Sequence, residues 1–556
     1  MSTGAEVPRD RLHLLRITIE ALSPLSFGSG DVLTVERRHR TGDAMESRRA
    51  DVTALVRDCN GLPVIPGATL QGRLRHLYDA EYGDAETRIL FGYAEGTKGD
   101  AGRLFAGFAA VHDQDDHALT GLVTDATRIK KDPILRALRQ DEPLRRDHVA
   151  LNARHVADGR KKFDRRAVPI GTRFSTEFAL WGTEAEASED KAALARIVRL
   201  FGHPAFRIGG GGHHGYGRVV VRRCSYACLG LDNTAALRRL RTQEPSVSLA
   251  ENIVPEIDAF GRAVTMKLRL TPINPWRIGG HGHYLTENTH GTRLADGGTV
   301  SKTGAGLREE REAADVATIL REPVIAWANG KAELRETTQT SAFEPRLPNG
   351  VAFSVPGSAI KGPLVHRALF HWNRLRSDID GMIDVETWLK LDVAEQAEAM
   401  KKLADRPLEL GYLFGTAKER AGDAGRAGCA FFNDGAVADV QAVQAMDHIV
   451  IDRFSGGVFP GLLYVEEVLA GGSVETTITM LPPPREAGGT DWPANIRDAF
   501  LLALRDLCSG QLAIGAKSLG FCTGDIVAWT GADDLKSPWE TAWLALAGAT
   551  PGKAGA

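Results

Sequence analysis

Apolar and polar residues alternate along several segments of the chain, with the period of two that is typical of a strand with one buried face. The alternation is clearest in RLHLLRITIEAL (residues 11–22), VPIGTRFSTEFAL (residues 168–180) and AVTMKLRLTP (residues 263–272). A longer period appears in LQGRLRHLYD, where Leu70, Leu74 and Leu77 fall on one face of a helix. The pattern predicts a mixed protein in which helices connect half-buried strands.

The chain also repeats itself. LPVIPGATLQGRLRHLYDA (residues 62–80) resembles AFSVPGSAIKGPLVHRALF (residues 352–370), and each predicts a helix that begins at a Pro-Gly pair. Both copies further share an alternating opening strand, an LFG tripeptide before a glycine-rich loop, an Asp-His segment and a late alternating strand. Each copy then closes with a glycine-rich loop and a strand, FRIGGGGHHGYGRVVV (residues 206–221) or LAIGAKSLGFCTGDIV (residues 512–527).

These repeats predict two domains, 1–228 and 263–556, with a linker at 229–262 and a boundary near residue 255. Residues 291–348 have no counterpart of that length and are predicted to be an insertion. The order strand, helix, strands, helix, strand indicates an α+β fold with two tandem ferredoxin-like domains of the RRM-like type. Many RNA-binding domains share that topology, although a topology does not fix a function.

The composition is that of a globular protein, with 43% hydrophobic and 25% charged residues among 556. No run of 18 apolar residues occurs and the N-terminal stretch has no apolar export core, so we expect a cytoplasmic protein without contact to a membrane. The six cysteines form no CxxC pair, which disfavours a disulfide framework and a four-cysteine zinc site. Cys224 and Cys228 could share a metal with nearby histidines, but a place in a strand is the better interpretation.

The net charge of −3 argues against a uniformly basic protein, yet the charges are distributed unevenly. Residues 128–173 hold fourteen Lys and Arg against six Asp and Glu, and residues 35–49 form a second basic segment. Either segment can be an ordinary solvated face. Because both lie in one half of a nearly neutral chain, contact with a polyanion is an equally good interpretation.

The two Pro-Gly helices have N-termini whose free N–H groups and dipole suit a phosphate. In the first copy the candidate RNA-binding residues are Gly67, Thr69, Arg73 and Arg75, and in the second they are Gly357, Ser358 and Lys361. The alternative is that Thr69 and Ser358 are ordinary helix caps.

The glycine-rich closing loops suit close approach to another backbone or to an anion. The candidates are Gly210, Gly212, Tyr216 for base stacking and Arg218 for phosphate, with Lys517 and Phe521 in the second copy. A flexible turn is the competing interpretation. His213 and His214 could ligate a metal or transfer protons, but adjacent loop histidines more often face solvent or a partner, and their purpose stays open.

In the order of these motifs, the chain resembles the RAMP superfamily, whose members form the backbone of type III CRISPR effector complexes. The resemblance covers nearly the whole chain in two copies and is closest to tandem subunits of type III-D-like systems. It implies palm domains that grip a guide RNA and a projecting hairpin that splays the guide–target duplex. The implied partners are the guide RNA, a complementary target RNA and other effector subunits.

The resemblance also implies cleavage of target RNA. In cutting members an Asp between the first strand and the Pro-Gly helix supports attack of a ribose 2′-OH on the adjacent phosphate, with a divalent metal such as Mg²⁺ or Mn²⁺, and leaves a cyclic phosphate. Asp31, Asp43, Asp51 and Asp58 are available, and Asp51, fifteen residues before Pro66, fits best as the catalytic and metal-binding residue. The competing role for Asp51 is a turn cap or an ion-pair partner of Arg48 or Arg49.

The second copy departs from that pattern, since Ser341 stands fifteen residues before Pro356 and no Asp occurs between Asp315 and Pro356. Asp296, Asp315 or Glu344 could reach the same place only through the insertion. An RNA-binding filament subunit without catalysis is therefore the alternative function. A metal hydrolase built on His281, His283, Glu287 and His290 is a weaker one, because their spacing is not that of a helical zinc motif.

Overall fold

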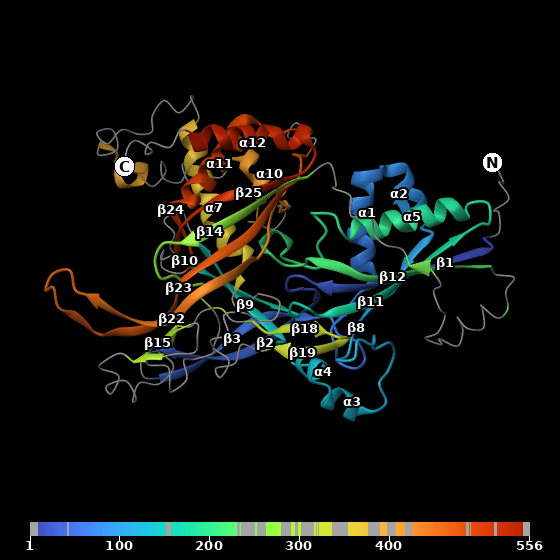
Figure 1. Cartoon of the computed structure of the whole chain (residues 1–556), viewed down its shortest axis with the longest axis horizontal. Helices are drawn as coiled ribbons and strands as arrows, with labels where there is room; N and C mark the ends of the chain where they lie inside the picture. The colour runs from blue at the N-terminus through green and yellow to red at the C-terminus, as the bar shows by residue number, and fades with distance from the viewer. Residues whose placement is uncertain are drawn as a thin grey trace.

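The computed structural model of the chain shows a mixed α+β protein, as the sequence pattern predicts (Figure 1). It describes residues 9–548 except 42–43, 152–156, 231–233, 235–250, 253–262, 280–290, 295–298, 302–315, 318–319, 321, 336–353, 376–389, 397–406, 417–424, 485–488, 490 and 516–519. Within these residues no helix is both long enough and apolar enough to cross a bilayer.

The first half is built on one antiparallel sheet with the strand order β13-β12-β1-β11-β8-β4. Its members are β1 (Arg11–Ala21), β4 (Val64–Ile65), β8 (Ala109–Val111), β11 (Arg173–Gly182), β12 (Val219–Gly230) and β13 (Glu251–Asn252), and β7 (Leu104–Ala106) pairs with β11. Every second residue of β11 is buried, which confirms the alternation seen in the sequence. Helices α1 (Gly67–Tyr82) and α5 (Ala187–Leu200) bury their apolar faces in the core of this half.

Two long hairpins leave this sheet. β2 (Gly28–Thr41) pairs with β3 (Ala44–Leu55), and β9 (Leu144–Leu151) pairs with β10 (Ala157–Ala167). The smaller elements of the half are α2 (Asp84–Phe91), β5 (Gly92–Glu95), β6 (Lys98–Ala101), α3 (Ala126–Lys131) and α4 (Pro133–Leu138). In Figure 1 the helices α1, α2 and α5 lie on one side of the sheet and the hairpins on the other.

The second half repeats this plan in a larger sheet, whose order runs β16-β15-β22-β23-β14-β25-β24. Its main members are β14 (Val264–Pro272), β22 (Gly435–Ile451), β23 (Val458–Met480), β24 (Ser509–Ile514) and β25 (Gly520–Thr530), and β20 (Ser354–Val355) and β21 (Ala430–Phe432) pair with β22 and β23. Helices α7 (Gly357–Leu375), α10 (Leu408–Phe414), α11 (Ala494–Cys508) and α12 (Asp533–Gly548) complete the half. Figure 1 shows the long β22–β23 hairpin projecting away from the body of the protein.

The three central strands follow the same order in the two sheets. In the first, β1 lies between the closing strand β12 and the late strand β11, and in the second β14 lies between β25 and β23 in the same way. Each half also has its own apolar core, one centred on Leu15 and Ile17 and the other on Met266 and Leu268. The centres of the two sheets therefore share one strand order.

Part of the insertion packs against the other half. Residues of β18 (Val324–Ala328) and β19 (Lys331–Arg335) form a hairpin, and its Ile325 and Ala332 belong to the core of the first half. Backbone hydrogen bonds fix it there, from Ile325 N to Ile170 O over 2.9 Å and from Ala332 N to Gln114 O over 2.7 Å. The described remainder of the insertion, β15 (Gly291–Leu294), β16 (Thr299–Ser301) and β17 (Val316–Ala317), joins the sheet of the second half.

Candidate functional site

The glycine-rich loop of the first half lies between α5 and β12 and contains one 3-10 turn, η1 (Gly212–His214). Gly209, Gly211, Gly215 and Gly217 all have φ between +79° and +100°, a region that residues with a Cβ rarely adopt. The loop folds back on the start of the half, where Gly210 N donates to Ser26 O over 2.7 Å. The four glycines thus form a defined turn.

This loop docks onto the second half through His213. Its ring stacks on Phe431 of β21 with a centroid distance of 4.2 Å, and Nδ1 lies 3.1 Å from Ala430 O. Because a carbonyl oxygen only accepts, Nδ1 carries a proton and donates it to Ala430 O. Burial lowers the pKa of His213 to about 4 and that of His214 to about 3, which keeps both uncharged near neutral pH. His213 therefore packs against the second half of the same chain.

A buried ion cluster lies beside this contact. Arg146 of β9 donates through Nη2 to Asp434 Oδ2 and to Glu322 Oε2, each over 2.7 Å, and its side chain is only 2% exposed. Burial opposes the charge of Arg146, but the carboxylates of Asp434 and Glu322 outweigh it and hold the pKa of the guanidinium well above its ordinary value. The cluster ties the first half to two separate segments of the second.

Asp434 also caps the N-terminus of α7, because Gly357 N donates to its Oδ1 over 2.9 Å. A Cβ added at Gly215 would collide with the same carboxylate, so only glycine lets the loop approach this closely. The predicted phosphate position at Gly357 is thus occupied by a carboxylate of the chain itself. In α1, by contrast, the N-cap residue Pro66 makes no side-chain cap hydrogen bond.

Tyr216 is fully buried at the base of the loop. Its hydroxyl lies 2.8 Å from His148 Nε2, and the guanidinium of Arg146 lies 5.1 Å from its ring centroid. Burial raises the pKa of the Tyr216 hydroxyl above its ordinary value. The ring packs between protein groups in this conformation, and its role in base stacking stays a prediction.

The remaining candidate RNA-binding residues divide by exposure. Arg75 is exposed on α1, whereas Arg73 donates to Ala205 O and its guanidinium is partly buried. Gly67, Gly357 and Lys361 are buried. Partly exposed positions are Thr69, Gly210, Gly212, Arg218, Ser358 and Phe521, and burial lowers the pKa of Arg218. Lys517 lies outside the described residues.

Asp51 lies on β3 of the β2–β3 hairpin, where its backbone pairs with Thr34 of β2. The region between the first strand and the Pro-Gly helix thus contains a long hairpin that also carries Arg48 and Arg49. Of the other acids in this region, Asp58 accepts from Asn60 N over 2.8 Å and from Leu62 N over 2.9 Å, so it stabilises a turn.

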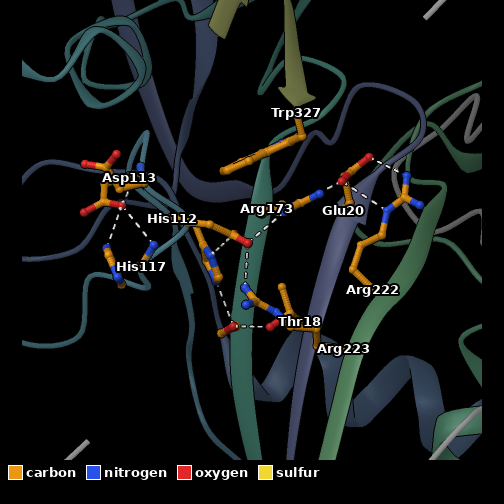
Figure 2. A network of polar contacts seen from close by, with 12 residues as sticks. Thr18, Glu20, His112, Asp113, His117, Arg173, Arg222, Arg223 and Trp327 are labelled. Carbon is orange, nitrogen blue, oxygen red and sulfur yellow. Dashed lines mark hydrogen bonds and ion pairs between the residues drawn. The ribbon is translucent and has the colours of Figure 1, made fainter. Parts of the chain in front are cut away.

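A polar network that the sequence did not indicate covers the open face of the first sheet (Figure 2). Arg173 donates to Glu20 Oε2 and Asp116 Oδ2, each over 2.8 Å, and Trp327 of the inserted hairpin stacks over its guanidinium at 4.0 Å. Two arginines of β12 add ion pairs to the same network, Arg222 with Glu20 and Arg223 with Asp116. The network fastens the inserted hairpin to the sheet.

His112 continues this network, with Nδ1 2.8 Å from Asp116 Oδ1 and Nε2 2.8 Å from Ser175 Oγ. Burial lowers the pKa of His112 although Asp116 opposes the shift, so the neutral ring donates to Asp116 and accepts from Ser175. The order serine, histidine, aspartate resembles that of a nucleophilic triad. The backbone of Ser175 is paired with Thr18 on one side and Ala110 on the other, so it offers no oxyanion hole, and the group acts as a hydrogen-bond network.

Metal ligands do not gather in the part of the chain that the structure describes, where no group of three or more His, Cys, Asp or Glu side chains could hold an ion. Cys224 is buried on β12, and burial raises its pKa to about 12, which disfavours the thiolate that a metal requires. The cluster of His281, His283, Glu287 and His290 lies outside the described residues, as do Asp296, Asp315, Ser341 and Glu344.

Comparison with known proteins adds one finding to this geometry. A search of curated proteins found no match to the chain. Residues 18–220, which run from β1 to the start of β12 and include the β2–β3 hairpin, α1 and the glycine-rich loop, match the model of the RAMP superfamily, and this match supports RAMP-superfamily membership.

Proposed function

We propose that the chain is a backbone subunit of a type III CRISPR effector complex, of the III-D-like kind, in which two tandem ferredoxin-like palms bind a guide RNA. The RAMP-superfamily match over residues 18–220 carries this proposal. The equivalent strand orders of the two halves support the second palm, which lies outside the matched residues. A complementary target RNA and other effector subunits are the partners that follow from this function.

The guide would run along groups that remain accessible when the halves are joined. Arg75 is exposed on α1, and Ala68 and Thr69 in the first turn of the same helix are exposed and partly exposed, at a helix end that suits a phosphate. The basic segments 35–49 and 128–173 lie largely on the β2–β3 hairpin and on the α3, α4, β9 and β10 region of the same half. Binding would therefore be strongest on the first half and would depend on salt.

Cleavage of the target RNA is the catalytic part of the proposal, with Asp51 as its carboxylate. The carboxylate would hold Mg²⁺ or Mn²⁺, which supplies positive charge at the scissile phosphate when bound. The ribose 2′-OH attacks the adjacent phosphorus, the bond to the 5′ oxygen breaks, and the products are a 2′,3′-cyclic phosphate and a 5′-hydroxyl. No aspartate stands at the corresponding distance before the second helix, so the proposal places cutting in the first half.

The test is cleavage of labelled complementary RNA by the full chain loaded with its guide RNA and Mg²⁺. Asp51→Ala should lower the cleavage rate by roughly 10²-fold or more while guide affinity is retained. Asp31→Ala is the matched control, because Asp31 is an exposed acid of the same hairpin, on β2. A wild-type protein that binds guide and target without cutting would refute the catalytic part and leave the structural subunit. If Asp51→Ala cuts the target as fast as Asp31→Ala and wild type do, Asp51 is the wrong residue.

A further inference from the structure

Four cationic side chains gather where the glycine-rich loop of the first half meets the second half. Ile208 N donates to Gly217 O over 2.9 Å, which brings their chain neighbours Arg207 and Arg218 to the two sides of one backbone contact. The loop also contacts α7 of the second half through η1. We name as junction cations Arg73 of α1, Arg207 before the loop, Arg218 after it and Lys361 of α7.

The junction cations lie close enough to act on one another and on His213. Burial is the largest cause of the low pKa of His213, and the charges of Lys361, Arg73 and Arg207 lower it further. Burial likewise lowers the pKa of Arg207 to about 9, with added contributions from the charges of Arg218 and Arg73. Like charges shift a pKa in this way when they lie nearby, so the four cations form one group around the loop.

The hydrogen bonds of Arg207 do not neutralise its charge. Nη1 donates to Pro204 O and to Phe206 O, each over 2.8 Å, and Nη2 donates to Asn433 Oδ1 over 2.7 Å. All three acceptors are uncharged, and the residue is only 6% exposed. Water therefore solvates this guanidinium very little, and its positive charge stays uncompensated by the groups that it touches.

Two buried N–H groups of the junction cations also have no acceptor. Within the residues that the structure describes, neither Arg73 Nε nor Arg207 Nε has a hydrogen-bond partner. In that same part of the chain no carboxylate forms an ion pair with Arg73, Arg207 or Arg218, although burial lowers the pKa of all three. A buried donor without an acceptor is costly, so these groups indicate a missing partner that is negatively charged.

The carboxylate of Asp434 does not fill that role. Its charge opposes the fall in the pKa of Arg207 and of Arg218, but its oxygens are already bound to Arg146 Nη2 and to Gly357 N. A phosphate-like oxyanion would meet the requirement, because its oxygens accept from several arginines at once and guanidinium groups match their geometry.

We infer that the junction binds one oxyanion of phosphate size, held by Arg73, Arg207 and Arg218 with Lys361 beside them. Arg207 and Lys361 are buried and Arg73 and Arg218 are partly exposed, so the site is enclosed but accessible from one side. The anion stabilises the contact between the first half and α7. Inorganic phosphate and a phosphate group of RNA share this chemistry, and the inference requires neither guide binding nor cleavage.

The test is titration of the RNA-free full chain with sodium phosphate, against sodium chloride at equal ionic strength. Wild type should bind one phosphate per chain in calorimetry, and its melting temperature should rise more in phosphate than in chloride. Arg218→Met should lower the phosphate affinity by about 10-fold or more, since a charged hydrogen bond is lost, and Arg218→Lys should retain most of it. The control Arg374→Met changes an exposed arginine at the far end of α7 and should bind phosphate like wild type.

A second titration, in the presence of saturating oligouridylate with a 5′-hydroxyl end, identifies the source of the anion. If inorganic phosphate still raises the melting temperature of the RNA-bound protein, the site takes a free anion. If that response is lost, a phosphate group of the RNA occupies the site. Equal responses of wild type to phosphate and chloride, or equal phosphate affinity of Arg218→Met and wild type, would overturn the inference, whereas a failure of target cleavage would not affect it.

Discussion

Removing the charge of Arg146 should destabilise the junction more than any surface substitution. Arg146→Met leaves Glu322 and Asp434 with side-chain exposures of 4% and 10% and no cation between them. Breaking a buried ion pair by removal of one partner costs about 3–5 kcal/mol, since the remaining charges are neither solvated nor paired. For a half of roughly 250 residues, that corresponds to a fall in melting temperature of about 6–20 °C.

The assay is a thermal melt of the full chain, followed by circular dichroism at low salt. Arg16→Met is the matched control, because Arg16 forms a 2.9 Å ion pair with Glu177 in which both side chains are 38% exposed. Exposed pairs contribute about 0–1 kcal/mol, so this variant should melt close to wild type. Adding Glu322→Gln and Asp434→Asn to Arg146→Met removes the unpaired charges and should restore part of the loss. Equal melting of Arg146→Met and wild type would refute the reasoning.

Acid should weaken the junction through His213, whose pKa is about 4 when folded and about 6.5 when unfolded, so stability is full above pH 6.5 and falls as the pH drops toward 4. His213→Phe keeps a ring against Phe431 and should reduce the loss of stability between pH 7 and pH 4.5 by up to about 3 kcal/mol, measured by denaturant titration at both pH values. The control His117→Phe changes an exposed histidine, and its stability should fall with pH as that of wild type does. Guide RNA affinity should fall with ionic strength by about 0.7 logarithmic units per neutralised phosphate, and Arg75→Ala should reduce that slope by about one such step. A slope near zero in filter-binding measurements would contradict phosphate contact.

The elements that follow from local pattern could be predicted from the sequence. The alternation of β11 and the helix after Pro66 depend on side chains close in sequence, and both are present. The inserted hairpin had a readable signal as well, because Asn329 and Gly330 have φ of +51° and +74° and form the two-residue turn that joins β18 to β19. An Asn-Gly pair between alternating residues predicts such a hairpin, although nothing in it indicates the surface that it covers.

The junction could not be predicted, since it depends on residues far apart in the chain. Tyr216 and His213 have the composition of a nucleic-acid loop. Tyr216 is buried against Arg146 of its own half, and the burial of His213 against Phe431 follows only from the placement of the second half. Glycine at position 215 is required by the carboxylate of Asp434, more than two hundred residues away. The sequence therefore indicates that the loop contacts something closely, while the identity of its neighbour requires the fold.

The inserted hairpin also affects how the protein is made. Ile325 and Ala332 complete the apolar core of the first half, yet they lie roughly a hundred residues beyond the end of β12 at Gly230. A ribosome therefore releases the whole first half before the side chains that close its core have been translated. During that interval Trp327 is missing from Arg173, and the site around Ile170 and Gly171 is open to solvent or a chaperone. The two halves consequently mature together.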